Sequence, residues 1–292
     1  MDSGSKYSDG TMGALIEELL GQRARTGVQG YIKETRVDSE GHVQHVIHPH
    51  SPSKSPSPPL RSPSPPSPPR ARIGYGGGRV GLAEREVRAL VVVDVQNDFL
   101  PGGALGVPDG DEVVGVINGI RSEFDVVVLT QDYHPEGHVS FASSHPGAEP
   151  YSVGAGVGKD GEDLHLWPDH CVQGSRGVEF APDLVMDGCD FVVRKGTDKG
   201  IDAFSGFGPD NGPPTPLAEI LRGHHVDAVY VVGLALDYCV RATALDAVAE
   251  GFENVFLVTD ATRPVAPDSG AKALADLLAA GVRMTTSQAL CL

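Results

Sequence analysis

Cys239 lies where an apolar run meets a helical pattern, a place where a thiol could act as a nucleophile. The surrounding segment reads VYVVGLALDYCVRATALDAVAEG (residues 229–251). A thiol there would lie near the positive end of the helix dipole and the free N–H groups of the first turn, which favour the thiolate. A small packed residue would occupy the same position, so the nucleophile needs partners elsewhere in the chain.

Two candidate partners, Asp94 and Lys195, stand at or near the ends of other apolar runs. Asp94 interrupts VVVDVQNDF, and a lone buried aspartate is costly unless it is paired or acts as an acid or base. The segment alone leaves a structural and a catalytic role open. Lys195 ends FVVRK before Gly196, where a surface lysine would be ordinary. At the carboxyl end of a buried parallel strand it could instead stabilise a thiolate or developing negative charge.

A second group of side chains has the composition of a metal site. Asp132 and His134 are two residues apart in LTQDYHPEGHVSF, so on extended backbone they point the same way. A carboxylate and an imidazole on one face can bind a divalent metal together. His138 follows in a short loop, and His170 comes later in HLWPDHCV. A single D-x-H triplet often arises by chance.

The elements that would position these residues alternate along the chain from residue 84 onward. Continuous apolar runs, typical of strands buried on both faces, occupy 89–95, 126–130, 191–194, 229–233 and 255–259. Helical patterns accompany them at 111–122, 216–222, 240–250 and 269–280. The alternation predicts one α/β domain over residues 84–292, with a mostly parallel sheet and helices on both faces. Functional residues of such a domain gather at the carboxyl ends of the strands.

Residues 1–80 have a different composition, which predicts a largely disordered, low-complexity region. The Ser/Pro repeat at 51–72, SPSKSPSPPLRSPSPPSPPRAR, should form an extended, solvated linker. The His-rich stretch HVQHVIHPH (42–50) is interpreted as a disordered patch that would bind metal only adventitiously.

Charge and cysteine usage exclude several classes of protein. Residues 1–80 carry a net charge of +3 and the remaining chain −19, within a total of −16. This acidity disfavours binding to nucleic acid or to an anionic membrane surface. The four cysteines have no regular spacing and are read as reduced thiols of an intracellular protein. With no long apolar run and no clear targeting signal, a soluble cytoplasmic protein is expected.

Five motifs carry a family resemblance. In order they are VVVDVQNDF, QDYHPEGHVSF, WPDHC, VVRKG with AFSGF, and VGLALDYCVRATA. On an alternating α/β pattern they closely resemble nicotinamidases, the metal-dependent branch of the isochorismatase-like cysteine hydrolases. The resemblance runs from Ala89 to the C-terminus. It implies hydrolysis of nicotinamide to nicotinate and ammonia through a cysteine thioester, in NAD salvage.

The resemblance also implies a role for each candidate residue. Asp94, Lys195 and Cys239 would form the catalytic triad, with the oxyanion held beside a cis peptide bond between Leu234 and Ala235. The implied metal ligands are Asp132, His134 and His170, with His138 as a second-ranked ligand. Zinc is the expected ion, with iron or manganese as alternatives, and it would hold the pyridine nitrogen. The implied walls of a slot for the flat ring are Phe99, Leu105, Trp167 and Tyr238.

Three other readings remain. A cysteine amidohydrolase of the same fold that acts on a ureido or N-carbamoyl amide would share the triad but typically lack the D-x-H and W-P-x-H-C pair. A catalytically silent binding module is a non-enzymatic alternative. A redox-sensing thiol would need a resolving cysteine near Cys239, and the spacing provides none. The expected partner is the small molecule nicotinamide, and a homo-oligomer is left open.

Overall fold

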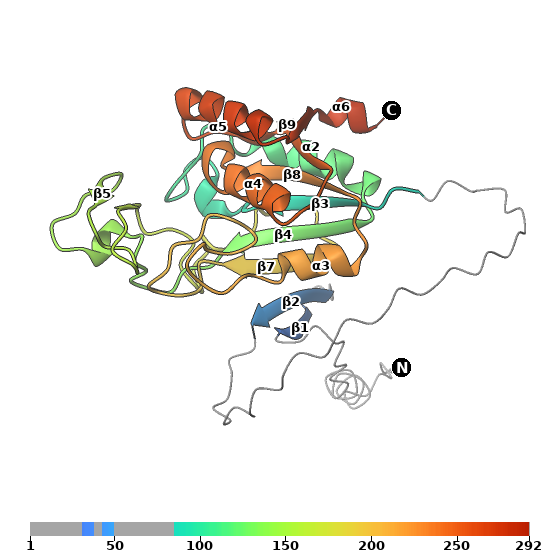
Figure 1. The fold of residues 1–292 in the computed structure, drawn as a ribbon. Helices are drawn as coiled ribbons and strands as arrows, with labels where there is room; N and C mark the ends of the chain where they lie inside the picture. The colour runs from blue at the N-terminus through green and yellow to red at the C-terminus, as the bar shows by residue number, and fades with distance from the viewer. Residues whose placement is uncertain (1–30, 38–42, 50–84, 292) are drawn as a thin grey trace, which may run out of the picture. The chain divides into compact units, whose positions relative to one another are not determined.

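The site is carried by one sheet, whose core is six parallel strands in the order β7-β4-β3-β8-β9-β10 (Figure 1). The computed structural model describes residues 31–37, 43–49 and 85–291. The six strands are β3 (Arg88–Val93), β4 (Val126–Asp132), β7 (Phe191–Lys195), β8 (Ala228–Leu234), β9 (Val255–Arg263) and β10 (Arg283–Thr285). Their central members are β-branched and apolar because both faces of the sheet are buried. The predicted α/β fold with a mostly parallel sheet is confirmed.

Helices cover both faces of the sheet (Figure 1). One face packs against α3 (Leu217–Gly223), α4 (Arg241–Ala249) and α5 (Pro267–Ala279). The other packs against α2 (Glu112–Ile120), and α6 (Ser287–Leu290) adds Leu290 at its margin. Among the described residues, no helix has both the length and the apolar content needed to cross a bilayer.

Several short elements differ from the sequence-based expectation. Three-residue 3-10 turns occur at η1 (Asn97–Phe99), η2 (Arg121–Glu123) and η3 (Ala142–Ser144), and β5 (Val153–Gly154) pairs with β6 (Leu164–His165). Strand β10 and helix α6 were also not predicted, because three or four residues are too few to show a period. These elements sit around the predicted sheet without changing its order.

The region 1–80 contains two strands where no regular structure was expected. β1 (Tyr31–Val37) and β2 (Val43–Pro49) pair antiparallel, and β2 runs parallel to β7 at the sheet edge. The Ser/Pro linker and the remainder of the predicted disordered region lie outside the described residues.

Strand register brings the candidate residues to one edge. Asp132 and Lys195 are direct partners on β4 and β7. Val93 of β3 is paired with Gly233 of β8, so Asp94 follows one strand where Leu234 ends the next. Parallel strands therefore deliver all these side chains to the carboxyl edge, as the alternating pattern predicted.

Candidate active site

Asp94, Lys195 and Cys239 are in mutual contact at this edge of the sheet. The Nζ of Lys195 lies 2.9 Å from Asp94 Oδ2 as an ion pair and 3.5 Å from Cys239 Sγ. Lys195 Nζ therefore lies between the Asp94 carboxylate and the Cys239 thiol. All three residues are buried. The structure thus brings together the three residues that the sequence placed on separate strand ends.

The backbone turns sharply at Asp94 to aim its carboxylate at the other two. Its φ of 49° lies in the left-handed region, which aspartate tolerates better than most residues. Thr130, on the neighbouring strand β4, holds the turn. Its carbonyl oxygen accepts the Asp94 N–H at 3.3 Å, and its Oγ1 donates to Asp94 Oδ1 at 2.6 Å. The carboxylate therefore has one oxygen fixed by Thr130 and one oxygen facing Lys195.

Cys239 lies in a π-helical turn, η4 (Leu236–Val240), between β8 and α4. The peptide bond before this turn, Leu234–Ala235, is cis. Asp237 ties the turn to the start of α5, because its carboxylate accepts the N–H groups of Val265 (2.9 Å) and Ala266 (3.3 Å). The nucleophile candidate is therefore held from the sheet and from a neighbouring helix.

Burial dominates the electrostatics of the three residues. It raises the pKa of the Asp94 carboxyl, while Lys195 opposes that shift. It raises the pKa of the Cys239 thiol well above its usual value, again against Lys195. Burial alone would lower the pKa of Lys195, but the carboxylates of Asp132 and Asp94 raise it well above its usual value.

The resting nucleophile is therefore a thiol beside a basic carboxylate. Burial raises the pKa of this thiol more than the nearby Lys195 ammonium lowers it, so the thiolate expected from the sequence forms when a proton passes to Asp94. A thiol close to a carboxylate of raised pKa can pass its proton to that carboxylate as it attacks a substrate.

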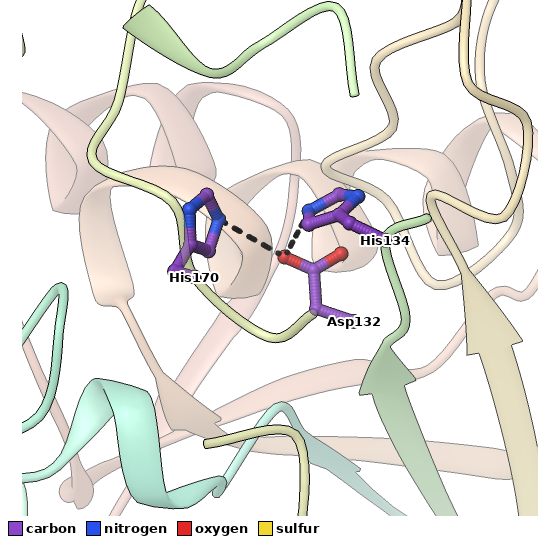
Figure 2. A group of neighbouring side chains, drawn as sticks. All are labelled: Asp132, His134 and His170. Atoms are coloured by element: carbon purple, nitrogen blue, oxygen red, sulfur yellow. Dashed lines mark ion pairs between the residues drawn. The ribbon is translucent and has the colours of Figure 1, made fainter. Parts of the chain in front are cut away.

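Asp132, His134 and His170 form a second cluster beside the first (Figure 2). We refer to these three residues as the metal-type cluster. Asp132 Oδ2 lies 3.1 Å from His134 Nε2 and 3.6 Å from His170 Nε2. Each histidine places Nδ1 against a main-chain carbonyl oxygen, that of Gly196 at 2.9 Å and that of Pro168 at 2.8 Å. In each bond Nδ1 donates, because a carbonyl oxygen only accepts, and this leaves Nε2 as the ring nitrogen that faces Asp132 and could bind a metal. The donor set of two imidazoles and one carboxylate fits a divalent transition metal.

His138 lies against His134, with the two rings tilted, but does not join this cluster. Their ring centroids are 4.1 Å apart. Its Nδ1 is 2.8 Å from Ser140 Oγ and its Nε2 is 3.0 Å from the Ile201 carbonyl oxygen, so both ring nitrogens have partners. Burial lowers the pKa of His138 to about 4, which keeps the ring neutral.

Both clusters open onto one pocket. The predicted ring-contacting residues Phe99, Leu105, Trp167 and Tyr238 all line it, together with Cys239, Ala235 and the three residues of the metal-type cluster. Trp167 and Tyr238 meet edge to face with centroids 5.1 Å apart. Asp94, Lys195 and Leu234 are buried and do not line the pocket.

Five further lining residues were missed by the sequence analysis: Val107, Asp202, Ala203, Phe204 and Val265. Three of them follow β7 in GIDAFSGF, next to a motif that was noticed, and the acidic Asp202 was the available signal. Ala203 also contributes its carbonyl oxygen, which accepts a hydrogen bond from Lys195 Nζ at 3.1 Å.

The chain is similar in sequence and fold to several known nicotinamidases. The chain is 44% identical over 207 residues to the nicotinamidase of Escherichia coli, covering 68% of this chain and 94% of that protein. The solved Acinetobacter baumanii nicotinamidase pyrazinamidase superposes with a TM-score of 0.66 at 41% identity, covering 71% and 99% of the two chains. A Pyrococcus horikoshii pyrazinamidase solved with zinc gives 0.56 at 37%, covering 68% and 98%. Residues 88–289 match the isochorismatase domain family, and the chain therefore belongs to that family.

Proposed function

We propose that this protein is a nicotinamidase, which hydrolyses nicotinamide to nicotinate and ammonia in NAD salvage. The observation that carries the proposal is one pocket lined by both Cys239 and the Asp132–His134–His170 cluster. A thiol nucleophile serves amide hydrolysis in general. A metal-type cluster beside it suits a substrate that also carries a ligand atom, as the pyridine ring of nicotinamide does. Nicotinamidases are also the relatives at 38–44% identity in bacteria and yeast.

The first half of the reaction forms a thioester. Asp94 accepts the Cys239 proton as Sγ attacks the amide carbonyl carbon, and Lys195 stabilises the sulfur while it carries charge. The N–H groups of Ala235 and Cys239 hold the oxyanion. The carbon–nitrogen bond then breaks, and Asp94 returns the proton to the departing ammonia.

The second half of the reaction restores the enzyme. Water attacks the thioester carbon while Asp94 accepts a proton from it. The carbon–sulfur bond breaks, Cys239 regains its proton from Asp94, and the nicotinic acid that leaves gives up its proton to solvent to become nicotinate. One carboxylate therefore serves as base and acid in both halves, for which its raised pKa is suited.

The metal-type cluster orients the substrate in this proposal. Asp132, His134 and His170 would hold a divalent ion, with zinc proposed first and iron or manganese as alternatives. A bound ion supplies a Lewis-acid position for the pyridine nitrogen. The aromatic side chains of Phe99, Trp167 and Tyr238 form the walls against the ring.

Ammonia release from nicotinamide tests the function. Purified, zinc-loaded protein is expected to release ammonia from nicotinamide. The release should stop after a chelator removes the metal and resume when zinc is returned. If zinc-loaded protein does not hydrolyse nicotinamide but hydrolyses a ureido or N-carbamoyl amide, the substrate assignment is wrong. The assignment to the isochorismatase domain family would still hold.

The ligand assignment predicts different outcomes for two neighbouring histidines. His170→Ala is expected to weaken zinc binding more than about 100-fold, because it removes a ligand. His138→Ala is expected to weaken it by no more than about tenfold, because the ring contacts His134 without pointing a free nitrogen at the cluster. Zinc titration against a chromophoric chelator measures both. Equal losses in the two variants would contradict the assignment.

We also propose a cytoplasmic location. A thiol nucleophile has to stay reduced, and the four cysteines, all within the described residues, are free.

A further inference from the structure

One carboxylate in the pocket has no part in the reaction described above. Asp202 lines the pocket beside the metal-type cluster. Its Oδ1 accepts the N–H of Ala203 at 3.0 Å. Its Oδ2 is fully buried and has no hydrogen-bond partner among the described residues. A buried carboxylate oxygen left in this state costs free energy unless a ligand uses it.

The segment that carries Asp202 is held firmly in place. Val139 N–H donates to the Lys199 carbonyl oxygen at 2.8 Å, and His138 Nε2 donates to that of Ile201 at 3.0 Å. One residue beyond Asp202, the Ala203 carbonyl oxygen accepts Lys195 Nζ at 3.1 Å. Because both sides of Asp202 are fixed, its placement in the pocket is a property of the fold.

The charges around Asp202 indicate what its free oxygen would bind. Burial raises the pKa of the Asp202 carboxyl and the nearby Asp132 carboxylate adds to this shift, while His134 and Lys195 oppose it. Asp132 already shares its Oδ1 with the Lys195 ammonium at 3.0 Å. With a divalent ion bound to this cluster, the ion and the Lys195 ammonium would together carry more positive charge than the carboxylates of Asp132 and Asp94 can neutralise. A second carboxylate on the cluster's side of the pocket restores the balance.

We infer that Asp202 positions the metal's water ligands: its free Oδ2 accepts their hydrogen bonds, and its charge offsets that of the ion. Three protein ligands leave coordination positions for water or substrate on a divalent ion. Hydrogen-bond acceptors behind those positions raise metal affinity. The inference rests on the metal site of the proposed function, and it assigns Asp202 as a positioning residue.

The test is zinc affinity of Asp202→Asn, measured on metal-free protein by competition with a chromophoric chelator. The variant is expected to bind zinc about 10- to 100-fold more weakly than wild type. Asp198→Asn is the matched control, because Asp198 lies on the same segment and is exposed, and its carboxylate accepts one hydrogen bond in the described structure, from the Gly200 N–H at 2.9 Å. It is expected to bind zinc as wild type does.

A thermal readout separates this role from a structural one. Metal-free Asp202→Asn is expected to melt at the same temperature as metal-free wild type or higher, because an unpartnered buried charge has been removed. With zinc it is expected to melt lower than zinc-loaded wild type. A lower melting temperature in the metal-free state would overturn the inference in favour of a structural role.

The remaining outcomes are equally decisive. Zinc affinity of Asp202→Asn within twofold of wild type would overturn the inference, and a raised KM for nicotinamide beside it would place Asp202 against the substrate. If wild type itself binds no zinc, the metal site of the proposed function fails, and Asp202 loses the role inferred for it.

Discussion

Cys239→Ala is expected to lower kcat for nicotinamide hydrolysis by about 10⁴-fold or more, the scale seen when a nucleophile is removed from a catalytic triad. The reason is that Sγ forms the bond to the substrate carbon, and no other thiol lines the pocket. Zinc affinity should stay near that of wild type, because Cys239 is not a member of the metal-type cluster. Initial rates of ammonia release at saturating nicotinamide measure the loss.

Cys189→Ala is the matched control for this experiment. It removes the same chemical group from an exposed cysteine outside the pocket and is expected to leave kcat unchanged. Substrate affinity, measured by equilibrium binding of nicotinamide, should persist in Cys239→Ala. Turnover within tenfold of wild type in the Cys239 variant would rule out the thioester route and point to water activated elsewhere in the pocket.

The strand-end residues could be predicted from the sequence because alternation determines where they go. Apolar runs separated by helical patterns imply a parallel sheet, and a parallel sheet brings Asp132 and Lys195 to a shared edge. The nucleophile followed from the same logic, since Cys239 lies in the turn between a buried strand and a helix. Resemblance to a known family then supplied roles that spacing alone left open.

The features of the site that could not be predicted from the sequence depend on how deeply a side chain is buried and on segments of irregular backbone. The thiol state of Cys239 is set by desolvation, which a sequence does not report. Asp202 lies in a segment without periodicity, so its acidic side chain next to the AFSGF motif was the one signal that the sequence offered for it. The imidazole of His138 is a suitable metal ligand by its chemistry. Only the structure shows that both of its ring nitrogens are already hydrogen-bonded, to Ser140 and to Ile201.

Lys195→Met is expected to lower the free energy of unfolding of the metal-free protein by about 3–5 kcal/mol, the usual cost of removing one partner from a buried ion pair. Its Nζ lies 2.9 Å from Asp94 Oδ2 and 3.0 Å from Asp132 Oδ1, and all three side chains are buried. Without the ammonium, two carboxylates remain close together with no compensating charge. Urea denaturation measures the change, and metal-free protein is required because a bound cation would offset the loss.

Two further variants give this prediction its controls. Lys272→Met removes an ammonium that pairs with Asp276 on the surface of α5 and is expected to change stability by less than about 1 kcal/mol. The double variant Asp94→Asn/Lys195→Met should recover part of the lost free energy of unfolding, because one of the two unpaired carboxylates has been removed. A Lys195→Met variant as stable as wild type would mean that the carboxylates take up protons at little cost. Lys195 would then act on Cys239 alone, and the network that joins the triad to Asp132 would not be needed to hold the fold together.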